Sequence, residues 1–183
     1  EFVFVFVIAE PLSGTYQSAK LAMNMLDDPS KVHLFDSIMA AFGNEMLLLE
    51  LLKMTEEEQA FDAIVERMNK LILNAGLVFT SEDLISLIRS GRLSKAKAMI
   101  GTVLRVKPLI KMVEGKLDLF TSERTHKKVI ANIVNVMRET TKGAKTIHIR
   151  VLSHNSLEQA RELEKSIKEA FTNIKLTFNE YLG

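Results

Sequence analysis

The feature that most constrains the fold is the apolar segment 2–9 together with the turn that follows it. This segment consists only of Phe, Val, Ile and Ala, without polar alternation. Such a pattern is typical of a strand covered on both faces, as in a parallel sheet. The turn 10–14 contains Pro11 and Gly14, and apolar residues then recur at helical spacing over 15–26. Strand, tight turn and helix in this order predict an α/β fold.

The rest of the N-terminal half continues this alternation. A short strand at 32–35 precedes a helix from Ile38 to about Met54, which is apolar around most of its circumference. We expect this helix to be deeply buried and to form one wall of a ligand cavity. Residues 55–58 have the pattern of a capping box before an amphipathic helix. We expect residues 1–74 to form part of an N-terminal α/β domain with a Rossmann-like parallel sheet.

Residues 75–183 are expected to form a C-terminal α/β domain, with a mixed or antiparallel sheet flanked by helices. Glu114 and Gly115 predict a hairpin turn, and Pro108 moves the first hairpin arm toward a sheet edge. The predicted elements are a strand at 77–80, a short helix ending at Gly91, hairpin arms at 103–113 and 116–122, a helix at 126–140, a strand at 146–152, a helix through Phe171 that starts with a capping box at Ser156, and a half-exposed strand at 174–179.

Composition excludes several classes of protein. Lys and Arg number 24 against 23 Asp and Glu, so no overall field favours nucleic acid or an anionic membrane. No apolar run approaches the length of about 20 residues that spans a bilayer, so we expect no stable membrane insertion. Cysteine is absent, which fits a reducing compartment such as the cytoplasm. The first residues already have strand character, and we expect further residues before Glu1 in the complete protein.

The turn Leu12, Ser13, Gly14, Thr15 is the candidate site for an anionic group. Unpaired amides and the positive end of a helix dipole face outward where a strand leads into a helix. The hydroxyl groups of Ser13 and Thr15 can donate to a carboxylate or phosphate, and Gly14 permits close approach. The same residues also serve as an ordinary helix cap, and local chemistry leaves both interpretations open.

Other site chemistries find no support. The four His residues lie in different elements and have no Cys partners, so we expect no metal site. No nucleophile elbow surrounds Ser13, and no glycine-rich loop ending in Lys is present to hold a nucleotide. The nine Met residues, Met39 among them, either fill the core or line an adaptable lipid pocket.

Residues 12–19 resemble the signature turn of the DegV family. Further matches to the family follow in the same order along the chain: Asp36 and Ser37, residues 79–93 with Ser90, Gly91 and Arg92, Gly101, Lys107 and Pro108, Glu114 to Lys116, and Arg124 with Thr125. The chain departs from the pattern at Ala9 and Glu10, where the family has a pair of serines. The family's N-terminal Asp-Ser-Thr strand and C-terminal His-x-Gly-Pro-Gly segment are also absent.

The resemblance implies a non-enzymatic protein that holds one long-chain fatty acid between two α/β domains, with no other cofactor. It also implies that a separate fatty acid kinase receives the carboxylate, which is bound at the signature turn. The buried acyl chain then supplies most of the affinity. The candidate ligand-binding residues are Leu12, Ser13, Gly14 and Thr15 at the head group, Ile38, Leu84, Leu87, Ile100 and Leu104 around the tail, and Arg92 and Arg124 from the family match.

Two alternatives remain open. A small-molecule enzyme would use Asp36 or Glu10 as a general base in the same cleft. A regulatory protein would act through the basic stretch 89–111. The same stretch also fits a docking patch for an acidic partner such as the kinase, or an ordinary solvated face.

Overall fold

The computed structural model describes residues 2–81, 84–93 and 106–181. The chain divides into two compact units. The first comprises Glu1–Val78, Ile85–Ala98 and Ile110–Leu119, and the second Phe79–Leu84, Met99–Leu109 and Phe120–Gly183. Three segments expected in the C-terminal domain, 75–78, 85–98 and 110–119, thus group with the first unit. A domain boundary near Asn74 stays a prediction.

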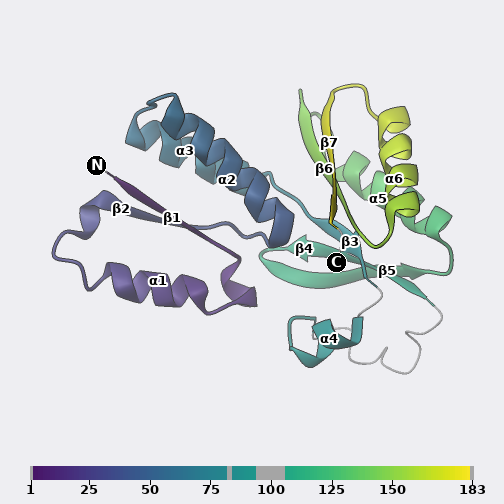
Figure 1. Cartoon of the computed structure of the whole chain (residues 1–183), viewed down its shortest axis with the longest axis horizontal. Helices are drawn as coiled ribbons and strands as arrows, with labels where there is room; N and C mark the ends of the chain where they lie inside the picture. The colour runs from purple at the N-terminus through teal and green to yellow at the C-terminus, as the bar shows by residue number, and fades with distance from the viewer. Residues whose placement is uncertain (1, 82–83, 94–105, 182–183) are drawn as a thin grey trace. The chain divides into compact units, whose positions relative to one another are not determined.

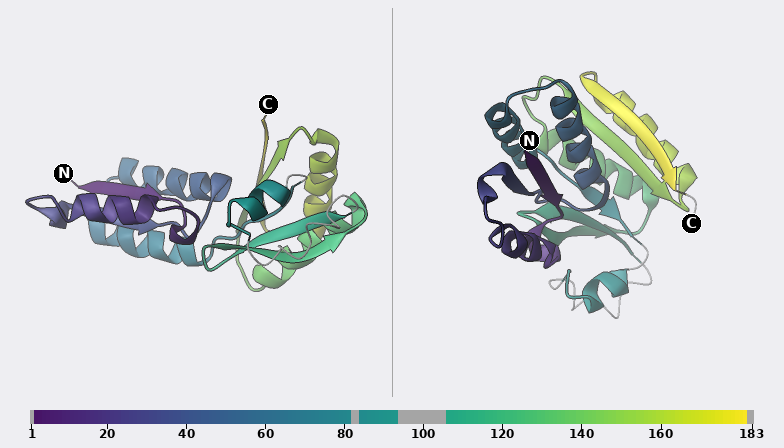
Figure 2. Two further views of the ribbon diagram at one scale, coloured as in Figure 1. Left: turned by 90° about the horizontal axis from the view of Figure 1, so that it is seen from below. Right: turned by 60° about the vertical axis from the view of Figure 1, so that its left-hand side comes forward.

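The first unit is built on a parallel pair of strands. Strands β1 (Val3–Val7) and β2 (Val32–Asp36) pair with Val3 opposite Val32 and Val7 opposite Asp36. Helix α1 (Thr15–Met23) lies on one face of this pair, and helices α2 (Ala41–Glu56) and α3 (Phe61–Leu73) lie on the other (Figures 1 and 2). Two short 3-10 turns, Glu10–Leu12 and Pro29–Lys31, connect these elements. The predicted α/β layering with a parallel sheet is confirmed.

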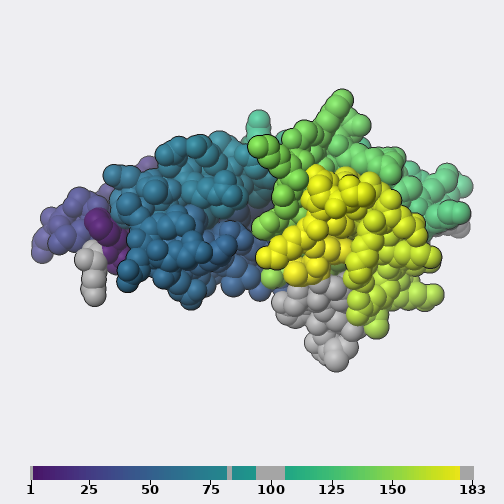
Figure 3. All heavy atoms as spheres, turned by 90° about the horizontal axis from the view of Figure 1, so that it is seen from above, coloured from purple at the N-terminus to yellow at the C-terminus, as the bar shows by residue number. Residues whose placement is uncertain are grey.

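The core of this unit lies between β2 and the two long helices. Phe35 is 2% exposed and Met68 is fully buried, and they pack with Leu47, Leu51 and Ile64. Burial of this apolar surface is the main driving force for folding. From the helix side, α2 and α3 cover most of the strands (Figure 3).

Helix α2 differs from its prediction in two ways. It begins at Ala41 rather than Ile38, because Ile38 has a positive φ of 53° and Ala40 is extended at φ −137° and ψ 165°, and neither conformation continues a right-handed α-helix. It is also less buried than expected. Leu48, Leu49 and Leu52 are 39%, 46% and 48% exposed, because the helix contacts its neighbours along one face only.

The predicted capping box at 55–58 is wrong. Thr55 lies inside α2, and its hydroxyl group donates to the carbonyl oxygen of Leu52 at 2.7 Å. Helix α3 instead begins after Ala60, which makes no side-chain capping bond. A Thr hydroxyl can bond back to its own helix, and it does so here in the last turn.

Strands β3 (Val78–Thr80), β4 (Lys107–Val113) and β5 (Lys116–Glu123) form a sheet in the order β3-β4-β5, and helix α4 (Leu84–Arg89) follows β3. Glu114 and Gly115 have φ of 49° and 75°, as the predicted hairpin turn requires. Pro108 was expected to place its strand at an edge, but β4 is the middle strand. The proline is the second residue of the strand, so the missing N–H affects only its start.

The second unit contains another parallel pair, β6 (Ile147–His154) and β7 (Ile174–Tyr181), with Ile147 opposite Ile174. Helices α5 (His126–Thr140) and α6 (Leu157–Ala170) lie on one side of these strands (Figure 1). Their apolar faces meet at a core of Val134, Val151, Ala160 and Ile167. The helices and strands predicted for this region are confirmed.

The two helix starts of the second unit differ in their caps. Thr125 caps α5, because its hydroxyl oxygen accepts from the amide of Lys128 at 3.4 Å. Ser156 precedes α6 as predicted, but its hydroxyl group donates to the carbonyl oxygen of His154 and makes no capping bond. No helix in the described ranges is long and apolar enough to cross a bilayer.

Candidate functional site

The turn between β1 and α1 is held by local hydrogen bonds. The amide of Leu12 donates to the carbonyl oxygen of Ala9 at 2.9 Å. The hydroxyl groups of Ser13 and Thr15 are 2.6 Å apart, and the Thr15 amide donates to the Ser13 hydroxyl at 3.3 Å. The residue at the N-cap position is Gly14, which has no side chain to cap with, and the space where its Cβ would lie is open. The turn therefore keeps two hydroxyl groups together at the start of a helix.

Asp36 ties this turn to the end of β2. Its Oδ1 atom accepts from the backbone amide of Ile38 at 2.9 Å and from that of Glu10 at 3.3 Å. These bonds link the two loops that leave the parallel strands, at the end of a sheet where α/β proteins commonly bind ligands. Asp36 thus has a structural role. This role accounts for the residue without the use as a general base that the enzyme alternative requires.

Ser37 stabilises the same loop from inside the unit. The side chain is fully buried, accepts from the Met39 amide at 3.1 Å and donates to the Met39 carbonyl oxygen at 3.2 Å. The Ala9 amide also donates to that carbonyl oxygen, at 2.8 Å. The bonded loop holds Ile38 in a left-handed conformation that is costly for a β-branched residue. Ile38 is therefore positioned by the loop and not, as predicted, by a helix.

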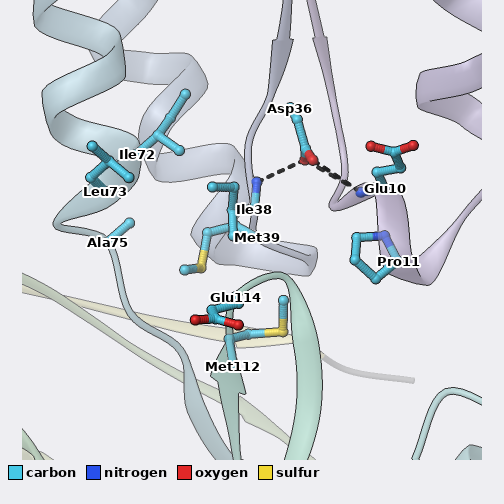
Figure 4. A pocket seen from close by; sticks show the side chains of 10 residues that line it. All are labelled: Glu10, Pro11, Asp36, Ile38, Met39, Ile72, Leu73, Ala75, Met112 and Glu114. Atoms are coloured by element: carbon cyan, nitrogen blue, oxygen red, sulfur yellow. Dashed lines mark hydrogen bonds between the residues drawn. The ribbon is translucent and has the colours of Figure 1, made fainter.

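Next to these loops lies a cavity of about 360 Å³, within the size range of small-molecule sites (Figure 4). A second cavity of about 300 Å³ shares four of its lining residues, so the two adjoin. The walls of the first are mainly apolar and come from both loops, the end of α3 and the β4–β5 hairpin. Its lining residues are Glu10, Pro11, Asp36, Ile38, Met39, Ile72, Leu73, Ala75, Met112 and Glu114.

The hairpin closely approaches Ala9 and Pro11, just before the signature turn. A Cβ atom at Gly115 would lie 3.2 Å from Cδ of Pro11 and 3.4 Å from Cβ of Ala9. The Met112 amide donates to the carbonyl oxygen of Leu77 at 2.9 Å, which fixes the hairpin to the segment after α3. The absence of a side chain at position 115 allows the turn and the hairpin to meet, and this contact closes one side of the cavity.

Among the residues that the structure describes, the charged groups that line this cavity are all acidic. Asp36 accepts from two backbone amides, and the carboxylate of Glu10 accepts from the side-chain amide of Gln17. Glu114 extends from the hairpin turn between the side chains of Met39 and Met112 (Figure 4). A guest in this cavity thus meets apolar walls and negative charge. Among the described residues, no three His, Asp or Glu side chains are arranged to hold a metal ion.

The predicted binding residues are only partly brought together. Ile38 lines the cavity, and Glu10 and Pro11 line it in place of Ser13, Gly14 and Thr15 of the same turn. The Nε atom of Arg92 donates to the carbonyl oxygen of Leu12 at 3.1 Å.

The residues predicted around the acyl tail, and the predicted basic residues, were also located in the structure where it describes them. Leu84 is fully buried and Leu87 is half-buried, but neither lines the cavity. Arg124 is exposed beside the α5 cap in the second unit. Ile100, Leu104 and most of the basic stretch 89–111 lie outside the described residues, so their roles stay predictions.

Sequence reasoning missed the distant walls of the cavity. Ile72, Leu73 and Ala75 lie where α3 ends, and Met112 and Glu114 belong to the hairpin. Residues 114–116 were matched to the family pattern, and this was the one signal that could have indicated a role at the site.

The chain is similar to known proteins of one family. The family model described as "Uncharacterised protein, DegV family" matches residues 1–180. A DegV domain-containing protein of Caldanaerobacter subterraneus is 29% identical over 168 residues, which are 92% of this chain and 60% of that protein. The chain thus spans about 60% of the length of the curated relatives it matches.

Two solved structures share the fold. A fatty-acid-binding DegV family protein of Thermus thermophilus has a TM-score of 0.86 and 28% identity, over 98% of this chain and 64% of that one. The Fatty Acid Kinase B3 protein of Streptococcus pneumoniae, loaded with linoleic acid, has a TM-score of 0.85 and 24% identity, over 97% and 64% of the two chains. The chain therefore belongs to the DegV family.

Proposed function

We propose that this protein binds a long-chain fatty acid, with its carboxyl end near the turn Leu12 to Thr15 and its acyl chain entering the apolar cavity of the first unit. The observation that carries this proposal is the cavity itself, which is bounded on one side by Glu10 and Pro11, the residues immediately before the signature turn. Each methylene group buried there contributes about 0.8 kcal/mol, so acyl length supplies affinity without specific polar contacts.

The fatty-acid-binding relative from Thermus thermophilus supports this ligand class. The paired hydroxyl groups of Ser13 and Thr15 and the open space at Gly14 suit an oxygen-rich head group at the helix start. The position of the acyl chain relative to Leu84, Leu87, Ile100, Leu104 and Arg124 is part of the proposal.

The proposal also covers the partner of the protein and its location in the cell. The protein carries its ligand without transforming it, presents it to a separate fatty acid kinase and works in the cytoplasm. The name of the Streptococcus pneumoniae protein supports the kinase partner, and the absence of cysteine suits a reducing compartment. An acyl phosphate should then form only when kinase and binding protein are both present.

The main experiment is lipid extraction from the natively purified full-length protein, followed by mass spectrometry. We expect near-stoichiometric fatty acid in the wild type. Ala75→Trp fills the cavity and should remove most of it, whereas Ala63→Trp, on the exposed side of α3, should keep it. Circular dichroism confirms that both variants are folded. A wild-type protein without acyl chains, or an Ala75→Trp variant that retains them, would refute the proposal.

A further inference from the structure

Two methionine side chains line the cavity from different elements. Met39 lies in the loop between β2 and α2, and Met112 lies in β4. Both side chains extend into the space between that loop and the hairpin (Figure 4). Met39 is 3% exposed and Met112 is half-buried. A thioether group is readily oxidised to a sulfoxide, so these walls carry reactive sulfur where an acyl chain would lie.

The sulfur atom of Met39 is held in one place. A Cβ atom at Gly43 would lie 3.1 Å from Sδ of Met39 and 3.4 Å from its Cγ, so the glycine leaves the space that this side chain occupies. The Met39 backbone is fixed as well, because its amide donates to the Ser37 hydroxyl at 3.1 Å and its carbonyl oxygen accepts from that hydroxyl at 3.2 Å. Methionine is usually an adaptable filler, and here its position in the wall is determined.

Burial separates these sulfur atoms from oxidants dissolved in water, because oxidation of a thioether group follows its exposure. A ligand inside the cavity reaches them without passing through solvent. Holding two reacting groups together in this way raises their effective concentration far above that of the free reactants. The oxidant that reaches Met39 most easily is therefore one carried by the ligand itself.

We propose that the cavity also accepts acyl hydroperoxides, and that Met39 and Met112 reduce the bound hydroperoxide to the corresponding hydroxy fatty acid. This inference rests on the proposed function and adds a second ligand class and a modification site. The sulfur lone pair attacks the terminal peroxide oxygen, an S–O bond forms and the O–O bond breaks. The hydroperoxide proton passes to the oxygen that remains on the acyl chain. The thioether is oxidised to a sulfoxide and the hydroperoxide is reduced to an alcohol, so each methionine converts one ligand.

The modification should weaken binding in turn. A sulfoxide is polar, and it replaces an apolar group in a wall that an acyl chain must contact. Placing a polar group there without a hydrogen-bond partner is unfavourable, and we expect affinity for a fatty acid to fall about tenfold after oxidation. The protein would then stop holding acyl chains after it has met peroxidised lipid, until the sulfoxide is reduced.

The test compares two oxidants on the delipidated full-length protein, with peptide mass spectrometry to locate the added oxygen. With a hydroperoxide of linoleic acid, Met39 and Met112 should be oxidised at least about tenfold faster than Met25, because the bound ligand lies against them. With hydrogen peroxide the order should reverse, because Met25 is 79% exposed. Met68 is fully buried in the core and does not line the cavity, so neither oxidant should modify it rapidly.

Lipid analysis of the same samples measures how much hydroxy acid forms for each hydroperoxide bound. Replacing both cavity methionines, by Met39→Leu with Met112→Leu, should reduce this ratio to background, since leucine is of similar size and carries no sulfur. Met25→Leu is the matched control and should keep the ratio of the wild type.

The outcomes separate this inference from the proposed function. A hydroperoxide that binds but oxidises the methionines in the same order as hydrogen peroxide overturns the inference and leaves fatty acid binding intact. Equal conversion by the wild type and the double leucine variant overturns it as well. If neither linoleic acid nor its hydroperoxide binds, both the inference and the proposed function are wrong. The comparison of the two oxidants on the wild type needs no variant.

Discussion

Replacing Ser37 with alanine should destabilise the first unit and loosen the loop that shapes the cavity. The Ser37 hydroxyl is fully buried and is the acceptor for the Met39 amide at 3.1 Å. Alanine leaves that amide buried without its partner, at a cost of about 1–3 kcal/mol. A loss of about 2 kcal/mol corresponds to roughly a 30-fold change in the unfolding equilibrium.

Urea unfolding followed by circular dichroism measures this loss as a lower midpoint at an unchanged slope. Hydrogen exchange of the Met39 amide should accelerate as well. Ser90→Ala is the matched control: that side chain is exposed, donates to the Leu87 carbonyl oxygen, and should change stability by less than about 0.5 kcal/mol. If Ser37→Ala and Ser90→Ala behave alike, the Ser37 bonds do not stabilise the loop.

Three further predictions concern the stability of the fold. Met68→Ala, in the buried core, should lower stability by about 2–5 kcal/mol in urea unfolding, whereas Leu73→Ala, at 76% exposure, should have little effect. Gly115→Ala should destabilise more than Gly143→Ala in thermal unfolding, because both have positive φ but only the first would bring a methyl group against Pro11 and Ala9. His33 is partly buried against aromatic rings, and this desolvation lowers its pKa below the ordinary 6.5. Its neutral form is favoured in the fold, so stability should be complete above pH 6.5 and fall as the pH drops below it, and His33→Gln should reduce that fall.

Much of the fold follows from periodicity in the sequence. The apolar run 2–9 predicted β1 in a parallel sheet, and the amphipathic pattern that follows residue 58 predicted α3 with its buried face. The paired positive φ of Glu114 and Gly115 followed from hairpin chemistry. In each case neighbouring residues along the chain determine the conformation, so the sequence alone carries the information.

The errors occur where other interactions override the conformation that the sequence pattern indicates. Ile38 is a β-branched residue at φ 53°, a conformation that its own chemistry disfavours and that the Asp36 and Ser37 bonds impose. Thr55 had the pattern of a cap, but the preceding helix extends through it. Pro108 was expected at an edge and lies in a central strand.

The sequence indicated the neighbourhood of the cavity but not its walls. Residues 12–15 indicated a candidate head-group site, because a strand followed by a helix exposes amides wherever it occurs, and this role stays a prediction. Met112 and Glu114 join the cavity only because the hairpin packs against Pro11, and periodicity does not report contacts so distant in sequence.

The central claim is that the cavity of the first unit holds the acyl chain, and methyl NMR of methionine tests it directly. Met39 and Met112 line the cavity, whereas Met25 follows the C-terminal end of α1, is 79% exposed and does not line the cavity. On addition of a fatty acid to the delipidated full-length protein labelled at methionine methyl groups, Met39 and Met112 should shift and show contacts to the acyl chain, while Met25 stays unchanged. A bound ligand that leaves Met39 and Met112 unperturbed would contradict the account.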